Sequence, residues 1–346
     1  MPPAATLEHF EPYRRALTGH CYRMLGSVMD AEDAVQEAML RAWKAADRFE
    51  GRSGVQTWLY RIATNVCLDT LAAAGRRRAR PVDEGAGLVD VDAVALPLPE
   101  RPREHWVEPI TDAAALPAPD ACDPERQAIL RESIRLAFVA ALQYLPPRQR
   151  AALLLTQVLG WTAVEAGETL GMSTAAVNSA LQRARATLGA RNPAVAPRAL
   201  TTAQEQTVAR YVAAFERYDV AALARLLHDD ATLSMPPFAL WLRGPHAITQ
   251  WLEGPGASCR GSRLVPVDAC GGTPAWAQYR DGGATPWALL VVELRGDRLA
   301  SMTSFLDVDT LFPRFGVPMW LASEPASGAA GTTALGRPMS LGRHAV

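Results

Sequence analysis

Apolar residues recur at helical spacing through the first 190 positions of the chain. Residues 30–46 read DAEDAVQEAMLRAWKAA, and their apolar positions follow the i, i+3, i+4 spacing of one helix face. We expect Asp30 to be the N-cap, with Asp33 three residues later in the place of the capping-box glutamate. A loop with two glycines, FEGRSGV, follows at 49–55. The next helix is predicted over residues 56–74.

The second half of the chain shows two further patterns. Residues 125–192 return to helical spacing, and one helix is expected to restart at Pro147, because proline is favoured in a first turn. From residue 203 the chain continues with two amphipathic helices and then with alternating apolar runs, which predict strands. A helix pair followed by a curved antiparallel sheet is typical of an α+β domain.

Two segments have a different composition. Residues 81–124 contain eight prolines, many acids and little periodicity, which is typical of an extended linker. Trp106, Val107 and Ile110 lie in this segment and are unusual in a passive tether. Residues 323–346 are rich in Gly, Ala and Ser, and we expect them to form a disordered tail.

Residues 163–188 have the pattern of a helix-turn-helix. Gly171 supplies the positive φ of a tight turn, and Ser173 can cap the helix that follows. The seam of that helix is apolar, and its opposite face carries Asn, Gln and Arg side chains, which can read base edges in a major groove. Gly167 indicates a close approach of the two helices. The alternative is an ordinary surface helix in a bundle.

The distribution of charge supports a polyanionic partner better than the total does. The net charge is −1, but residues 126–200 hold 9 Lys+Arg against 3 Asp+Glu, while residues 81–125 hold 2 against 11. An apolar stretch long enough to span a membrane is missing, and we expect a cytoplasmic location without membrane contact. The five scattered cysteines indicate neither a disulfide framework nor a metal site.

Four motifs occur in a fixed order: DAEDAVQEAMLRAW, TWLYRIATNVCLD with a basic tail, the acidic linker, and LPPRQRAALLL before the helix-turn-helix. Together they resemble the extracytoplasmic-function (ECF) group of bacterial sigma-70 factors. The resemblance implies an all-α region-two domain at 6–80, an acidic Pro-rich linker at 81–124, and an all-α region-four domain at 125–192. It also implies binding to core RNA polymerase and promoter DNA, without a metal or cofactor.

The resemblance assigns three groups of candidate residues. The core-polymerase-binding group is Asp30, Glu32, Asp33, Gln36 and Glu37. The group for the −10 element is Arg52, Ser53, Trp58, Arg61, Asn65, Arg76, Arg77 and Arg78. The group for the −35 element is Ser173, Thr174, Asn178, Ser179, Gln182, Arg183 and Arg185.

Simpler roles stay open for several of these features. The acidic helix start and the arginine cluster can each be a solvated helix end, and Trp58 can be a core aromatic residue. The linker can be a soluble spacer. Alternatively, it can mimic nucleic acid in the basic channel of the polymerase.

Residues 203–320 resemble a SnoaL-like domain, a cone-shaped α+β fold that polyketide cyclases and small isomerases use. We expect no catalysis, because the candidate acid–base residues form no pair at a predictable spacing. These candidates are His228, Asp229, Asp230, Tyr279 and Asp307. We expect regulation in cis, through a contact of this domain with region two or the linker, at its apolar end FPRFGVPMWL. A pocket that takes a small-molecule ligand is a further expectation.

The predicted function is therefore a sigma factor that directs core RNA polymerase to −35 and −10 promoter elements. The alternative is a SnoaL-like enzyme or ligand sensor fused to a DNA-binding repressor.

Overall fold

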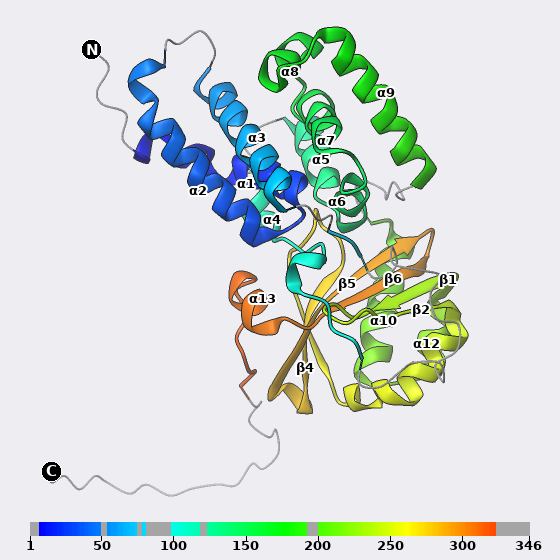
Figure 1. Ribbon diagram of the computed structural model, residues 1–346. Coiled ribbons are helices and arrows are strands. Elements are labelled where there is room, and N and C mark those ends of the chain that lie inside the picture. Colours follow the sequence, from blue (N-terminus) through cyan, green and yellow to red (C-terminus); the bar gives the residue numbers. More distant parts are fainter. Residues whose placement is uncertain are drawn as a thin grey trace, which may run out of the picture.

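The computed structural model describes residues 7–49, 54–74, 78–80, 98–117, 123–191 and 200–322. Figure 1 shows two groups of helices side by side above a mixed sheet, with the connecting segment between them. We name these parts the first helical domain (7–80), the connecting segment (98–117), the second helical domain (123–191) and the C-terminal domain (200–322). The candidate residues Arg52, Ser53, Arg76 and Arg77 and the expected tail at 323–346 lie outside the described residues.

The first helical domain contains η1 (Leu7–Tyr13), α1 (Arg14–Leu25), α2 (Val28–Lys44), η2 (Ala46–Arg48) and α3 (Val55–Ala74). The expected N-cap at Asp30 is wrong. Ser27 is the N-cap of α2, and its side chain accepts the N–H of Asp30. Because Ser27 offers a hydroxyl three residues earlier, Asp30 lies inside the first turn and its carboxylate is left for other partners.

The second helical domain contains α5 (Pro124–Ser133), α6 (Leu136–Leu142), α7 (Pro147–Leu153), the π-turn η6 (Leu154–Val158), α8 (Ala163–Leu170) and α9 (Thr174–Arg191). Helix α7 begins at Pro147, as predicted. Helix α8 begins with a capping box, in which the Thr162 hydroxyl accepts the Glu165 N–H and the Glu165 carboxylate accepts the Thr162 N–H.

The C-terminal domain opens with α10 (Thr202–Glu216) and α11 (Val220–Leu226). Its strands are β1 (Leu227–Ser234), β2 (Trp241–Arg243), β3 (Arg263–Pro266), β4 (Ala275–Arg280), β5 (Thr285–Arg295) and β6 (Arg298–Phe305). The remaining elements are α12 (Gly244–Glu253), η7 (Pro255–Cys259), η8 (Asp281–Gly283) and α13 (Val308–Arg314). These elements confirm the expected fold class, helical domains followed by an α+β domain.

The sheet has the order β2-β1-β6-β5-β4-β3 and is mixed, so the expectation of a purely antiparallel sheet is wrong. Strands β1 and β6 pair in parallel. The chain between them passes through α12 and four strands, and such a long return can bring a strand back in the same direction, which a hairpin cannot. The short strand β2 was not expected from the sequence.

The connecting segment is packed between the domains. It contains η5 (Arg103–His105) and α4 (Asp112–Ala115) and forms isolated bridges to both sides of the molecule. Trp106, Val107 and Ile110, the three apolar residues that the sequence marks as unusual, are all buried. Burial of three large apolar side chains stabilises the docked segment by roughly 1.5–3 kcal/mol each.

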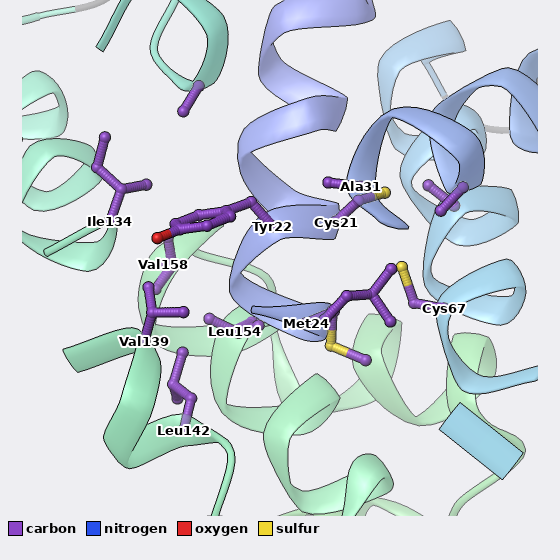
Figure 2. Packing of buried hydrophobic residues seen from close by; sticks show 14 of the residues in the cluster. Cys21, Tyr22, Met24, Ala31, Cys67, Ile134, Val139, Leu142, Leu154 and Val158 are labelled. Atoms are coloured by element: carbon purple, nitrogen blue, oxygen red, sulfur yellow. The ribbon is translucent and has the colours of Figure 1, made fainter. Parts of the chain in front are cut away.

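One apolar cluster joins the helical domains, the connecting segment and one face of the sheet. Figure 2 shows Tyr22 of α1 pointing toward Ile134, Val139 and Val158 of the second helical domain. In strand β5, Leu289 and Val291 belong to this shared cluster, whereas Leu290 and Val292 face the separate core under α10–α12. The C-terminal domain therefore covers the helical domains with one face of its sheet and keeps its own core on the other.

Candidate polymerase and promoter interfaces

The helix-turn-helix forms as the sequence predicts. Gly171 has φ +61°, and the Ser173 hydroxyl accepts the N–H of Ala176 in the first turn of α9. A Cβ on Gly167 would lie 2.6 Å from the Met172 carbonyl oxygen, so only glycine permits this approach. The seam residues Val177, Leu181 and Ala184 are buried.

The candidate −35 residues gather on the outer face of α9 and at its start. Six of them are exposed, and Ser179 is half-buried and accepts a hydrogen bond from Arg183 Nη1 at 3.0 Å. The exposed residues are Ser173, Thr174, Asn178, Gln182, Arg183 and Arg185. Their amides, hydroxyls and guanidinium groups form a polar face of the kind that enters a major groove.

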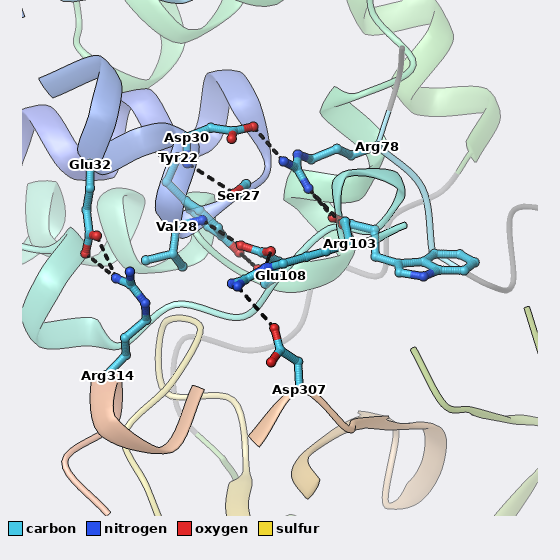
Figure 3. A network of polar contacts seen from close by, with 11 residues as sticks. Tyr22, Ser27, Val28, Asp30, Glu32, Arg78, Arg103, Glu108, Asp307 and Arg314 are labelled. Atoms are coloured by element: carbon cyan, nitrogen blue, oxygen red, sulfur yellow. Dashed lines mark hydrogen bonds and ion pairs between the residues drawn. The ribbon is translucent and has the colours of Figure 1, made fainter. Parts of the chain in front are cut away.

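The acidic face of α2 is partly occupied by other parts of the chain. Glu32 receives both of its ion-pair hydrogen bonds from Arg314 Nη1 of α13, at 2.7 and 2.6 Å. Figure 3 shows this pair, with α13 of the C-terminal domain beneath α2. Glu37 pairs with Arg41 of its own helix at 2.7 Å, while Asp33 and Gln36 are exposed.

Arg78, a candidate for contact with DNA phosphates, is buried in an intramolecular site. Its Nη2 lies 2.6 Å from Asp30 Oδ2, and its Nη1 donates to the carbonyls of Trp106 and Arg103 at 2.9 and 3.1 Å. The arginine thus joins α2 to the connecting segment (Figure 3). In this arrangement neither Arg78 nor Asp30 has its full charge available to an outside partner.

The candidate −10 residues of α3 differ in their surroundings. Trp58 is half-buried between Phe10 and Phe49, which indicates a core role for at least part of its ring. Arg61 forms an ion pair with Glu168 of α8 at 2.8 Å. Asn65 is exposed on the same helix. The second helical domain therefore engages one predicted DNA-reading side chain of the first.

A second polar network holds the connecting segment against α2. The buried carboxylate of Glu108 accepts the Val28 N–H at 3.1 Å, in the first turn of α2, and pairs with Arg103. Arg103 also lies 3.1 Å from Asp307 Oδ2 of the C-terminal domain. Figure 3 shows this chain of contacts from α2 through the connecting segment to Asp307.

Two buried arginines fasten the helical domains to each other. Arg23 of α1 donates from Nε to Ser133 Oγ at 2.6 Å, and Arg150 of α7 donates to the Met24 carbonyl. Burial lowers the pKa of each guanidinium to about 10. Each remains charged at neutral pH, and each bond depends on closure of the two domains.

Sequence reasoning did not find Arg23, Arg103, Glu108, Glu168 or Arg314 as partners of the site residues. No local pattern identifies them, because each pairs with a residue far away in the chain. The only signals were indirect: the apolar residues of the linker and the apolar end of the C-terminal domain. At that end Leu311 and Phe315 join the shared apolar cluster, while Arg314 makes the ionic contact.

The C-terminal domain contains a small apolar cavity of about 50 Å³. Aliphatic and aromatic side chains line it, together with Gln278 and Cys259. The candidate acid–base residues do not line it. Tyr279 donates to the Pro318 carbonyl at 2.6 Å, and Asp230 pairs with Arg243 at the surface.

Metal-binding clusters of His, Cys, Asp and Glu are absent from the described part of the chain. The four cysteines within it are unpaired thiols, and three of them are buried. Among the same residues, none of the helices combines the length and the apolar character needed to cross a membrane.

The fold defines a class of protein with two helical domains, the second of which carries a helix-turn-helix, and an α+β extension. Three family models match the chain. The model "Sigma-70 region 2" matches residues 9–77, the model "Sigma-70, region 4" matches residues 135–188, and the model "SnoaL-like domain" matches residues 208–305. The ECF RNA polymerase sigma factor SigG of Mycobacterium tuberculosis is 46% identical over 317 residues, which are 90% of this chain and 83% of the relative. SigJ of the same organism is 31% identical over 72% of each chain.

The chain belongs to the ECF sigma factors, with a C-terminal SnoaL-like domain. The resemblance read from the sequence is thereby confirmed. The crystal structure of SigJ shares the fold, with a TM-score of 0.59 and 22% identity over 91% of this chain and all of that one. The protein acts in transcription initiation and is a sigma factor rather than an enzyme. The alternative of a repressor fused to an enzyme or sensor has no support among these relatives.

Proposed function

We propose that this sigma factor binds core RNA polymerase through the acidic face of α2 and directs it to −35 and −10 promoter elements. In this proposal α9 reads the −35 element, and Asn65, Arg61 and their neighbours on α3 engage the −10 element. It acts in the cytoplasm, where polymerase and promoter DNA are found. The exposed polar face of α9 is the observation that supports the DNA-reading role.

We further propose that the described arrangement is a closed form, in which the C-terminal domain regulates the sigma domains in cis. Three ion pairs support the closed form: Arg314 with Glu32, Arg78 with Asp30, and Glu168 with Arg61. Each removes a candidate polymerase or DNA contact from use. The first of them joins the C-terminal domain to α2, and this pair supports the regulation in cis. The tether keeps the C-terminal domain at a high effective concentration, so weak pairs suffice to hold it.

Promoter geometry requires that a closed form opens. The two elements lie about two helical turns apart on DNA, or roughly 70 Å. In the structure the two helical domains share one apolar cluster and are joined by Arg23 and Arg150. Domains in direct contact cannot reach both elements at once, so the polymerase must separate them.

The connecting segment and the cavity have proposed roles within this scheme. Glu108 turns its carboxylate inward to α2, so part of the acidic linker serves the closed form. Once released, the segment can line the basic channel of the polymerase. A small-molecule ligand of the cavity would have to displace the cavity walls, because about 50 Å³ holds only a few atoms.

The pair between Arg314 and Glu32 offers a direct test. We expect Arg314→Glu to bind core polymerase about five- to tenfold more tightly than the natural chain. An ion pair this exposed contributes about 1 kcal/mol or less, and a like-charge contact disfavours closure by a similar amount. Arg225→Glu, at an exposed arginine of α11, is the matched control. The closed-form proposal fails if Arg314→Glu binds polymerase no better than this control.

A further inference from the structure

The turn Ala269–Gly272 of the C-terminal domain lies against the connecting segment through its backbone. The Cys270 N–H donates to the Ile110 carbonyl at 2.9 Å, and the Gly271 N–H donates to Asp112 Oδ1 at 2.7 Å. Burial raises the pKa of the Asp112 carboxyl, since a charged acceptor is costly in this position. The turn is thus fixed to the connecting segment, at and just before the start of α4, by hydrogen bonds that use no side chain of its own.

The other side of the same turn touches the carboxyl end of α5. A Cβ placed on Gly271 would overlap the carbonyl oxygen and carbon of Arg131, so the two backbones are in direct contact. The last turn of α5 also carries the partners of Arg23. The guanidinium of Arg23 donates to Ser133 Oγ and to the Leu130 carbonyl, at 2.6 and 3.3 Å. One short segment of α5 therefore contacts both the C-terminal domain and the first helical domain.

We propose that the turn Ala269–Gly272 is the docking surface of the C-terminal domain for the second helical domain, and that its partner is the carboxyl end of α5. The absence of a side chain at Gly271 permits the contact, and the contact holds α5 in place to receive Arg23. The turn is thus the lock between the second and first helical domains. This inference deepens the closed form proposed above by naming the contact that maintains it.

The neighbouring glycine provides a matched control. Gly271 and Gly272 both have positive φ, +74° and +78°, so alanine strains the backbone at either position. A Cβ on Gly272 would meet no atom within 4 Å, whereas a Cβ on Gly271 meets α5. The difference between Gly271→Ala and Gly272→Ala therefore isolates the contact with α5 from the strain of the turn.

Thiol labelling of the full chain measures how often the lock opens. Cys270 is fully buried in the turn itself and reports on its release. A Val139→Cys substitution on α6 adds a reporter in the buried contact beside Tyr22 (Figure 2), where the two helical domains meet. Cys67, buried in the core of the first helical domain, reports on unfolding. Labelling rates at each position are read by mass spectrometry of the separate peptides.

We expect Gly271→Ala to raise the labelling rate at Cys270 and at the Val139→Cys position by about 5- to 150-fold, the range for overpacking of a close contact. Gly272→Ala should change both rates less than about threefold, and Cys67 should stay protected in both variants. The inference is overturned if the two alanine variants behave alike. It is also overturned if Cys270 is released while the Val139→Cys position stays protected.

A second variant keeps the test decisive if Gly271→Ala exposes Cys67 through unfolding. Asp112→Ala removes the acceptor of the Gly271 N–H without adding an atom, and it should raise labelling at the Val139→Cys position. Unchanged labelling in Asp112→Ala would then refute the lock. Core-polymerase affinity separates this inference from the closed-form proposal. Raised labelling without tighter polymerase binding would leave the lock intact and refute the regulatory role.

Discussion

Removal of the Arg78 side chain should release the connecting segment from the first helical domain. The guanidinium makes three contacts in a buried site, one to the Asp30 carboxylate and two to the carbonyls of Trp106 and Arg103. The Arg78 side chain is 8% exposed and the Asp30 side chain 36%. Arg78→Ala therefore leaves Asp30 partly hydrated, but the Arg103 and Trp106 carbonyls of the segment lose their hydrogen-bond donor.

The magnitude follows from these exposures. The ion pair with Asp30 lies within the first helical domain, so its loss does not itself weaken the docking of the segment. The two charge-assisted hydrogen bonds to the carbonyls of the segment contribute about 1.5 kcal/mol each, because Arg78 is almost fully buried. The total of about 3 kcal/mol corresponds to a roughly 150-fold increase in the undocked population of the segment.

Amide hydrogen exchange reports this population directly. The N–H groups of Val107 and Glu108 donate to the Ala79 and Gly26 carbonyls, so they exchange only when the segment undocks. We expect their protection to fall about 150-fold in Arg78→Ala. The control Arg80→Ala loses a pair to Glu293 at 4.0 Å and should lower protection less than about fivefold.

The outcome also decides between two roles for Arg78. If Arg78 holds the segment, Arg78→Ala should bind core polymerase more tightly, because Asp30 and the face of α2 become available. If Arg78 serves only as a phosphate contact, protection of Val107 and Glu108 should be unchanged within about threefold. Promoter binding by the holoenzyme should then weaken, with a smaller dependence on salt. That second result would refute the reasoning.

Three further predictions concern single positions. Burial lowers the pKa of His20 to about 3, so its stabilisation is complete above pH 6.5 and is lost as the pH falls toward 3. The free energy of unfolding, measured in urea, should fall by roughly 1.4 kcal/mol for each pH unit by which the pH is lowered in that window. His20→Gln should flatten this slope. Gln182→Ala on α9 should weaken −35 binding by the holoenzyme by about 1–3 kcal/mol, measured by anisotropy on a selected promoter. A Cβ on Gly19 would overlap the Ala115 carbonyl, so Gly19→Ala should lower the free energy of unfolding by about 1–3 kcal/mol in urea.

Local signals predicted the helix-turn-helix in detail. The positive φ of Gly171, the cap at Ser173 and the seam from Val177 depend on neighbours within a few residues, and such neighbours are visible in the sequence. The N-cap of α2 shows the limit of this reasoning. Asp30 and Ser27 are both good caps, and only the backbone geometry selects Ser27.

The contacts that close the molecule could not be predicted in the same way. Arg314 and Glu32 are separated by 282 residues, and nothing in their local sequence relates them. The apolar end of the C-terminal domain indicated that a contact exists, because Leu311 and Phe315 need a covered surface. Which charged side chain meets which partner depends on how the domains pack. The parallel pair β1 and β6 is likewise a property of the whole domain.

The distance between the helical domains, with and without core polymerase, tests the central claim most directly. Spin probes at Ala72 of α3 and Ala186 of α9, both exposed, measure it in the full chain. We expect one short distance in the free protein and a shift to a separation of the order of two DNA turns, roughly 70 Å, in the promoter complex. A distance that stays the same when polymerase and promoter bind would contradict the closed form as a regulated state.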